Sequence, residues 1–405
     1  MKKKILLILH PYKFTEFTYY RYELSHFKKK KYKIIVHDLS QLVSNKDYDK
    51  VFKTRIYKKS LVFYSIYSWL KEFNRLRNNH KDILIYDFLH FGEQNLKAFF
   101  IQVILKHSNL PILKHNMSDI ATLKVKKNLK FFINKIKYHN LNIGIYFYSL
   151  KEIFFSFLIS ILRFNKLYLM VNKINKKNKL SYKKNYILGH SFDYSKNLIR
   201  KEKPSNKNIK KYILYFDSGV PYFGGDNPAI KRNPVKINNK KYYNDLNLYF
   251  DELEKFYKAK IIVIPHAKYK IKNLGNKNLN PYFNKRINDN SYDAISKWIS
   301  KSLLVISHGS SALSYAVAHY KPMHILFSKK HNFWTESEKK NIFFQSKILE
   351  SKIIDFTKIK KKDFSENFKI NKYKYDNYKY RYLTYKTKNT QKPINKIIQD
   401  LMQNL

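Results

Sequence analysis

The chain has 405 residues, 44% of them hydrophobic, so it is long enough for two domains with real apolar cores and is not a disordered chain. The absence of cysteine excludes a disulfide framework and thiolate metal sites, and it agrees with a reducing, cytoplasmic location. The net charge of +52 comes mainly from lysines spread along the whole chain. We therefore expect no nucleic-acid partner, but attraction to anionic surfaces, including phosphorylated substrates and the inner face of the cytoplasmic membrane.

The first 172 residues alternate between apolar strands and amphipathic helices. Strands are predicted at 4–9, 32–37, 82–86 and 110–113, and helices at 14–27, 64–73 and 93–106. The apolar run after the basic N-terminus is too short for a signal peptide, which is why we interpret it as a strand. A β-α-β order implies a parallel, doubly wound sheet, and the first strand leads into His10-Pro11 without a glycine-rich phosphate loop.

The most apolar stretch of the chain is Ile153–Leu162, with the sequence IFFSFLISIL. Arg163, Asn165 and Lys166 follow it, so the dense part is too short to span a bilayer. A buried helix is the expected structure. The alternative is a helix that lies in the plane of a membrane, assisted by flanking lysines.

A Lys/Asn-rich connector, Asn172–Lys184, predicts the boundary between an N-terminal domain of residues 1–172 and a C-terminal domain of residues 185–350. Strands are expected in the second domain at 186–188, 212–216, 261–264, 303–306 and 323–327, and helices at 242–257, 294–302 and 312–320. Residues 351–405 are expected to form a tail whose terminal helix packs on the first domain.

Polar groups follow three strands of the second half: Asp217-Ser218-Gly219, then His266 with Lys268, then the turn His308–Ser311. The carboxyl ends of parallel strands gather at one edge of a sheet, where ligands bind. A carboxylate, imidazoles, a lysine and a hydroxyl-rich helix start there would suit a base-activated acceptor and a phosphate leaving group.

Each of these groups also has a purely structural interpretation. Asp217 could simply start a turn, since aspartate is common in turns before glycine, and His266 could be an ordinary loop histidine. His308 could brace its turn, and Ser310 or Ser311 could simply cap the following helix.

We expect no metal site. The one D-x-D pair, Asp47-Tyr48-Asp49, lies in a polar stretch far from these strand ends and is interpreted as a solvated loop. Neither an H-E-x-x-H motif nor clustered His/Asp ligand spacing is present, which favours metal-independent chemistry.

The ordered series GHSFDY (189–194), YFDSGVP (215–221), IPHAK (264–268) and SHGSSALSYAVAHYKPM (307–323) resembles two groups of bacterial enzymes. One is the surface-polysaccharide glycosyltransferases with the two-domain GT-B-type fold, and the other is the bacterial sialyltransferases. The resemblance covers residues 186–327. It implies an α/β fold with two Rossmann-like domains that face a central cleft.

The resemblance also implies roles for individual residues. Asp217 would be the base, and the donor phosphate and nucleotide would contact His266, Ser310 and Ser311. From their place at the same strand ends, we expect Lys268, His308 and Gly309 on the donor side as well. The first half matches these families only in its β-α-β pattern, and we expect His10 and Asp87 to face the acceptor because they lie at strand ends of the first domain. Ser218 stands where a second acidic residue is typical, and Ala267 stands where proline is typical, which weighs against sialic acid as the donor sugar.

The predicted activity is metal-independent, inverting transfer of a sugar from a nucleotide-activated donor to a capsule, lipopolysaccharide or similar glycan. The partners would be the nucleotide-sugar and a glycan or glycolipid, with no resident cofactor. Three alternatives stay open. The first is a polyol-phosphate transferase or sugar epimerase on the same fold, and the second is a non-catalytic, membrane-associated scaffold of a polysaccharide assembly complex. The third, which the evenly spread charge disfavours, is a basic nucleic-acid binder, and salt-sensitive binding to RNA would indicate it.

Overall fold

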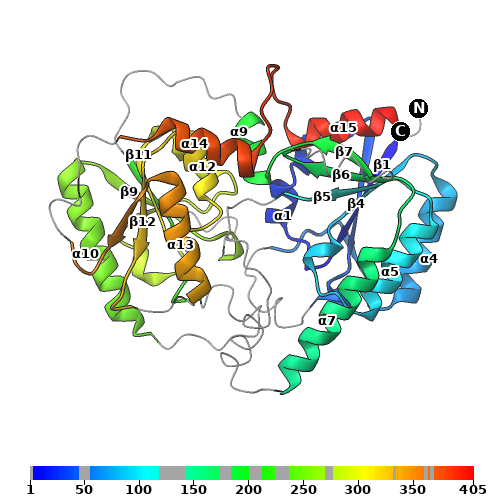
Figure 1. Ribbon diagram of the computed structural model, residues 1–405, viewed down its shortest axis with the longest axis horizontal. Helices are drawn as coiled ribbons and strands as arrows, with labels where there is room; N and C mark the ends of the chain where they lie inside the picture. Colours follow the sequence, from blue (N-terminus) through cyan, green and yellow to red (C-terminus); the bar gives the residue numbers. More distant parts are fainter. Residues whose placement is uncertain are drawn as a thin grey trace.

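The computed structural model describes residues 3–44, 55–117, 143–173, 184–199, 212–223, 237–269, 277–331, 334, 336–359, 364 and 369–405. They form two α/β domains, each built on a parallel sheet (Figure 1). The fold therefore confirms the predicted class of two Rossmann-like domains. The Asp47-Tyr48-Asp49 pair lies outside the described residues.

The first sheet has seven strands in the order β3-β2-β1-β4-β5-β6-β7, and all neighbours are parallel. Its strands are β1 (Lys4–His10), β2 (Tyr32–Asp38), β3 (Ser60–Val62), β4 (Ile83–Asp87), β5 (Ile112–His115), β6 (Leu167–Val171) and β7 (Lys184–Leu188). The order runs outward in both directions from the β1/β4 pair, so the chain reverses its winding there.

The predicted domain boundary is wrong. Strand β7 was expected to open the second domain, but it pairs with β6 in register from Leu167↔Lys184 to Val171↔Leu188. Residues 167–171 also form a strand, where the sequence pattern predicted none. The first sheet thus ends at Leu188, and the chain enters the second domain after helix α9 (Phe192–Ile199).

The second sheet has six strands in the order β10-β9-β8-β11-β12-β13, again all parallel. Its strands are β8 (Tyr212–Phe216), β9 (Lys260–Ile264), β10 (Ile287–Asn288), β11 (Ser302–Ser307), β12 (Met323–Phe327) and β13 (Lys352–Asp355). Strand β8 lies between β9 and β11, at the point where the winding reverses. A crevice for a ligand is expected beyond the carboxyl end of such a strand.

Helices cover both faces of each sheet, which explains why the central strands are continuous apolar runs such as YILYF in β8. The helices are α1 (Glu16–Arg21), α2 (Ser40–Val43), α4 (Ile66–Asn79), α5 (Leu96–His107), α7 (Ile143–Ile161), α9, α10 (Asn239–Tyr257), α11 (Ala294–Trp298), α12 (Leu313–Ala318), α13 (Glu336–Leu349), α14 (Lys372–Tyr378) and α15 (Ile394–Asn404). Short turns of helix are η1 (Leu24–His26), η2 (Leu89–Phe91), η3 (Ala267–Tyr269), η4 (Pro281–Phe283), η5 (Ile299–Lys301) and η7 (Lys379–Leu383).

Helix α10 shows how sequence positions produce this packing. Its side chains Tyr242, Leu246, Tyr249 and Leu253 recur every three or four residues, so they fall on one face and are fully buried against the second sheet. Asn238 begins the helix, because its side chain accepts a hydrogen bond from the Lys241 N–H at 3.0 Å.

Residues 351–405 are not a separate tail. Strand β13 is the edge strand of the second sheet, and Tyr375 and Tyr378 of α14 belong to the core of that domain. Helix α15 then returns to the first domain, where Ile394, Ile398 and Met402 pack into its core. Figure 1 shows α15, in red, lying over the first sheet.

The expected buried helix at 153–162 is wrong in one respect. Helix α7 buries Phe155 against α5, but it leaves Phe154 and Phe157 exposed. None of the helices in the described part of the chain combines the length and apolar character needed to cross a bilayer.

Candidate functional site

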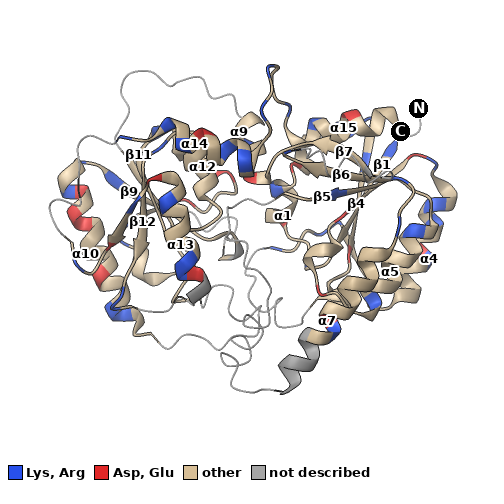
Figure 2. Cartoon of the chain, viewed as in Figure 1, with Lys and Arg blue, Asp and Glu red and all other residues tan. Residues whose placement is uncertain are grey.

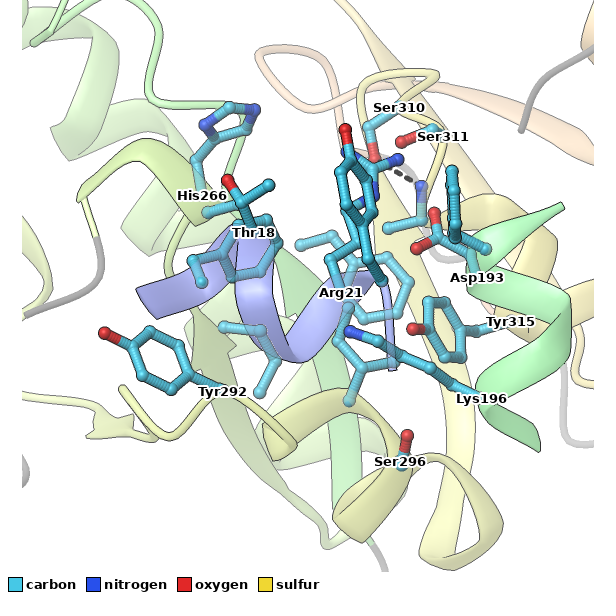
Figure 3. Close-up of a pocket in the computed structure, with 18 of the residues that line it drawn as sticks. Thr18, Arg21, Asp193, Lys196, His266, Tyr292, Ser296, Ser310, Ser311 and Tyr315 are labelled. Atoms are coloured by element: carbon cyan, nitrogen blue, oxygen red, sulfur yellow. Dashed lines mark hydrogen bonds between the residues drawn. The ribbon is translucent and has the colours of Figure 1, made fainter. Parts of the chain in front are cut away.

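A cavity of about 870 Å³ lies between the two domains. One wall comes from the end of β1, from α1 and from α9, and the other comes from the residues that follow β8, β9 and β11. Figure 3 shows α1 in the middle of the view, with His266 on one side and Asp193, Lys196 and Tyr315 on the other. The cavity therefore lies at the predicted edge of the second sheet.

Asp217 is the first residue after β8 and lines this cavity. Its backbone N–H donates to the Ile264 carbonyl at 3.0 Å, which holds the strand end of β8 beside β9. Burial raises the pKa of the Asp217 carboxyl from 3.8 to about 7, while a hydrogen bond from the Gly219 N–H opposes the shift. A carboxyl with such a pKa exchanges protons near neutral pH, as a general base must.

The turn after Asp217 requires glycine at position 219. Gly219 has φ of +71°, and a Cβ there would lie 2.5 Å from the Tyr269 ring. Its N–H donates to Asp217 Oδ1 at 3.0 Å. The glycine thus lets the backbone fold back onto the carboxylate and fixes one of its oxygens.

His266 follows β9 by two residues and lines the same cavity. Its carbonyl accepts a hydrogen bond from the Tyr269 N–H at 2.9 Å, which closes the short helix η3. Lys268 lies within η3, but its side chain is outside the described part of the structure. Asp217 and His266 are therefore brought to one cavity, as expected of neighbouring parallel strands.

The turn after β11 places Ser310 and Ser311 in the cavity wall. Gly309 has φ of +80°, so it takes a backbone conformation that other residues seldom adopt. Ser310 Oγ accepts a hydrogen bond from the Ala312 N–H at 3.1 Å, and Ser307 Oγ accepts one from the Ser310 N–H at 3.3 Å. The hydroxyl of Ser310 thus closes a turn just before α12, but it does not cap that helix, whose N-cap residue is Ala312.

His308 does not line the cavity. It is buried behind the turn, where its Nε2 lies 3.1 Å from the Tyr242 hydroxyl. Burial lowers the pKa of His308 to about 4, so the ring is neutral at physiological pH. The predicted contact of His308 with a donor phosphate is not supported by this position, and bracing of the turn is the role that fits.

The two first-domain residues predicted to face the cleft have different positions. His10 lines the cavity; its Nδ1–H donates to the Tyr12 carbonyl at 2.8 Å, and its Nε2 lies 3.2 Å from the Tyr22 hydroxyl. Asp87 is fully buried away from the cavity and lies 3.2 Å from Lys114 Nζ. Although burial opposes ionisation, Lys114 and neighbouring hydrogen bonds lower the pKa of Asp87. Asp87 and Lys114 therefore form a structural ion pair.

Sequence reasoning missed the charged residues that α1 and α9 bring to the cavity. They are Lys13, just before α1, then Arg21 on α1, and Asp193 and Lys196 on α9. Asp193 lies inside the GHSFDY stretch, which could have marked it. For the cations no signal was available, because lysine is spread along the whole chain.

Helix α9 is anchored in both domains. Phe192 packs into the core of the first domain, while Tyr194 packs into that of the second. Asn197 Oδ1 also lies 2.9 Å from His319 Nε2, just after α12. The side chains of Asp193 and Lys196 are therefore held at the junction where the two domains meet.

The cavity has more cationic than acidic side chains. Lys13, Arg21 and Lys196 face two carboxyls, Asp193 and Asp217, and the second of these is half protonated near pH 7. Within the described ranges no group of three or more His, Asp or Glu side chains is arranged to hold a metal ion. The arrangement suits an anionic ligand held by cations and hydroxyls beside one proton-accepting carboxylate.

No protein-family model and no characterised protein matches the chain in sequence. Among solved structures it is similar to a variant of the wall teichoic acid polymerase TagF, with 13% identity and a TM-score of 0.48 over 99% of this chain and 88% of that one. It is also similar to MurG of Acinetobacter baumannii, with 8% identity and a TM-score of 0.44 over 99% and 100% of the two chains. A third similar structure is a UDP-GlcNAc 2-epimerase from Methanocaldococcus jannaschii, with 10% identity and a TM-score of 0.41 over 99% of each chain. At these values the similarities assign no activity to the chain.

Proposed function

We propose that the chain is a glycosyltransferase that moves a sugar from a nucleotide-activated donor to a cell-surface glycan. The observation that carries the proposal is the Asp217 carboxyl, buried and with its pKa raised to about 7, in a cavity whose other charged side chains are mostly cations. A proton acceptor beside an anion site is what transfer from a sugar phosphate requires.

In the proposed reaction, Asp217 takes the proton of the acceptor hydroxyl. The acceptor oxygen attacks the anomeric carbon of the sugar, and the bond from that carbon to the phosphate oxygen breaks with its electron pair. A single displacement of this kind inverts the anomeric configuration. The departing nucleotide phosphate gains negative charge, which His266, Arg21 and Lys196 would stabilise from the cavity wall.

The hydroxyls of Ser310 and Ser311 lie on the second-domain wall with His266, so the donor is placed there. The acceptor is placed on the first-domain wall with His10 and Lys13, and Arg21 and Lys196 of that wall would meet the donor phosphate from across the cavity. This assignment separates the two substrates across the cavity and leaves Asp217 to act on the acceptor hydroxyl.

A thermal-shift screen of the purified chain against CMP, CDP, UDP, GDP and dTDP tests the proposal. We expect one nucleotide to raise the melting temperature of the wild type and of Asp217→Asn, but not that of His266→Ala. His107→Ala, an exposed histidine on α5, is the matched control and should respond like the wild type. An equal response in the His266→Ala protein would remove that residue from the donor site.

The same screen separates the proposal from the scaffold alternative. A folded wild-type protein that responds to none of the five nucleotides would contradict the proposed donor site and favour a non-catalytic role. Product analysis with the nucleotide-sugar that binds then distinguishes transfer from epimerisation, because an epimerase changes the sugar without needing a glycan acceptor.

A further inference from the structure

An apolar surface covers one side of the first domain, on helices α7 and α5. On α7 the exposed side chains are Leu150, Ile153, Phe154, Phe157 and Ile161, and on α5 they are Leu96 and Phe100. We call these seven residues the α5/α7 surface. Phe154 is 55% exposed and Phe157 is 62% exposed, which is unusual for phenylalanines on a helix whose other side is packed.

The spacing places the α7 residues on one stripe. Positions 150, 153, 154, 157 and 161 recur every three or four residues, so they fall within about a third of the helix circumference. The buried Phe155 lies on another side of α7, where its ring centroid is 6.3 Å from that of Phe99 on α5. Packing on α5 therefore fixes the orientation of the exposed stripe.

The charges around this surface are mainly positive. Lys97 and Lys106 lie on α5, Lys151 lies on α7, and Arg163 and Lys166 follow α7, whereas Glu152 is the one acidic residue on these two helices in their described side chains. Figure 2 shows α7 as mostly uncharged along its described length, with a basic position on it. An apolar stripe beside basic residues matches a bilayer surface that carries anionic headgroups.

We propose that the α5/α7 surface is a docking site for an anionic lipid bilayer. Helix α7 would lie in the plane of the interface, with Phe154 and Phe157 among the acyl chains and the neighbouring lysines at the headgroups. Because the exposed apolar stripe occupies only one side of α7, the contact would be peripheral and reversible.

Helix α7 also approaches the cavity, with its side away from the exposed stripe. The pKa of Tyr12, which lines the cavity, is raised to about 12 by burial, by Glu93 and by Glu152 of α7. Phe91, also in the cavity wall, is exposed and precedes α5. Docking through the exposed stripe therefore leaves the cavity side of α7 free, and it does not depend on the proposed activity.

Vesicle flotation of the full chain tests the proposal. We expect the wild type to float with vesicles of phosphatidylcholine mixed with phosphatidylglycerol, and the Phe154→Ser/Phe157→Ser variant to bind at least tenfold more weakly. The control variant Tyr67→Ser/Leu248→Ser removes two exposed side chains elsewhere and should bind like the wild type. The proposal would be overturned if high salt abolished binding while the Phe154→Ser/Phe157→Ser variant bound as tightly as the wild type. That result would mean that the protein adsorbs to the vesicles by its net charge alone.

The absence of cysteine allows a second readout that does not depend on affinity. Phe157→Cys and Leu248→Cys, which replace side chains exposed to 62% and 60%, can each carry a single polarity-sensitive fluorophore. We expect a blue shift with mixed vesicles at position 157 and none at position 248. Equal behaviour at both positions would overturn the proposal. So would a dimer in solution that Phe154→Ser/Phe157→Ser dissociates, since a second copy would then cover the surface.

Discussion

The Asp217 carboxyl combines two properties that oppose each other. It lies at the edge of a cavity, where a reacting hydroxyl could reach it, yet it is buried enough that its pKa is raised to about 7. A group that is easy to ionise in water is here costly to ionise, and that cost is the source of its basicity. The same residue should therefore limit both activity at low pH and stability at high pH.

Transfer should depend on the ionised form of Asp217. We expect kcat/KM to rise about tenfold per pH unit below pH 7 and to level off above it, because only the carboxylate accepts the proton. Asp217→Asn should lose on the order of a hundredfold or more in turnover while it keeps nucleotide affinity. Asp245→Asn, a carboxyl on α10 that pairs with Lys330 outside the cavity, is the control. A level pH profile in the wild type would remove Asp217 as the base.

Activity should rise with pH, but the contribution of Asp217 to the stability of the fold should fall. Between pH 4 and pH 7 the unfolded chain releases the Asp217 proton and the folded chain keeps it, so the free energy of unfolding falls as pH rises. Asparagine stays neutral, and we expect Asp217→Asn to be more stable than the wild type at pH 8 by up to roughly 4 kcal/mol. Urea denaturation at pH 8 and pH 4 measures this. The gain should disappear at pH 4, and a gain of equal size at both pH values would point to another cause.

At the scale of the elements, the site depends on three neighbouring strands and on the turns that follow them. The turn after β11 is constrained, because Gly309 has φ of +80° and the ring of His308 is packed behind it. Its geometry sets the positions of Ser310 and Ser311 in the cavity wall. A change in the turn should therefore affect both folding and nucleotide binding.

Gly309→Ala tests the turn. A Cβ at this position would lie 3.1 Å from Gln345 Oε1 and 3.2 Å from Ile342 Cγ1, in a backbone conformation that alanine disfavours. We expect a loss of about 1–2 kcal/mol of stability and weaker nucleotide binding, measured by urea denaturation and by titration with the nucleotide. Ser311→Ala removes a hydroxyl from the same wall without backbone strain. If the two variants lost equal stability, the turn would not be strained by a side chain at 309.

The sequence allowed us to predict which polar residues follow the strands, but not which sheet each strand joins. The apolar strands predicted that Asp217, His266 and the 308–311 turn gather at one sheet edge, because parallel strands share their direction. It could not assign β7 to the first sheet, since a short strand does not reveal its partner. It could not rank His308 against Ser310 either, because the turn at Gly309, with φ of +80°, decides which side each of them faces.

At the scale of the whole molecule, the two domains are joined more than once. The chain crosses between them at α9 and again before α15, and the Ser191 N–H donates to the Leu383 carbonyl at 2.8 Å where the two crossings meet. Glu23 Oε2 accepts a hydrogen bond from the Asn395 N–H at 3.0 Å, which fixes the start of α15 on the first domain. The C-terminal helix is thus part of the first domain in packing, although it is last in sequence.

Ile398→Ala tests this arrangement. The side chain is fully buried in the first-domain core, so we expect a loss of about 2–5 kcal/mol. Trp69 is buried in the same domain, while Trp298 and Trp334 lie in the second, so replacing the latter two by phenylalanine leaves a fluorescence reporter of the first domain. The unfolding midpoint reported by Trp69 should fall, and an unchanged midpoint would mean that α15 does not stabilise that domain. Leu248→Ala, an exposed position on α10, is the control.

The most direct test of the account is transfer itself. The nucleotide-sugar identified by the binding screen, labelled in its sugar, would be incubated with membrane glycans and with either the wild type or Asp217→Asn. We expect the wild type to release the nucleotide and to move the label to the glycan, whereas Asp217→Asn should bind the donor and transfer almost nothing. Transfer at the wild-type rate by Asp217→Asn, or nucleotide binding by the wild type with no transfer to any glycan, would contradict it.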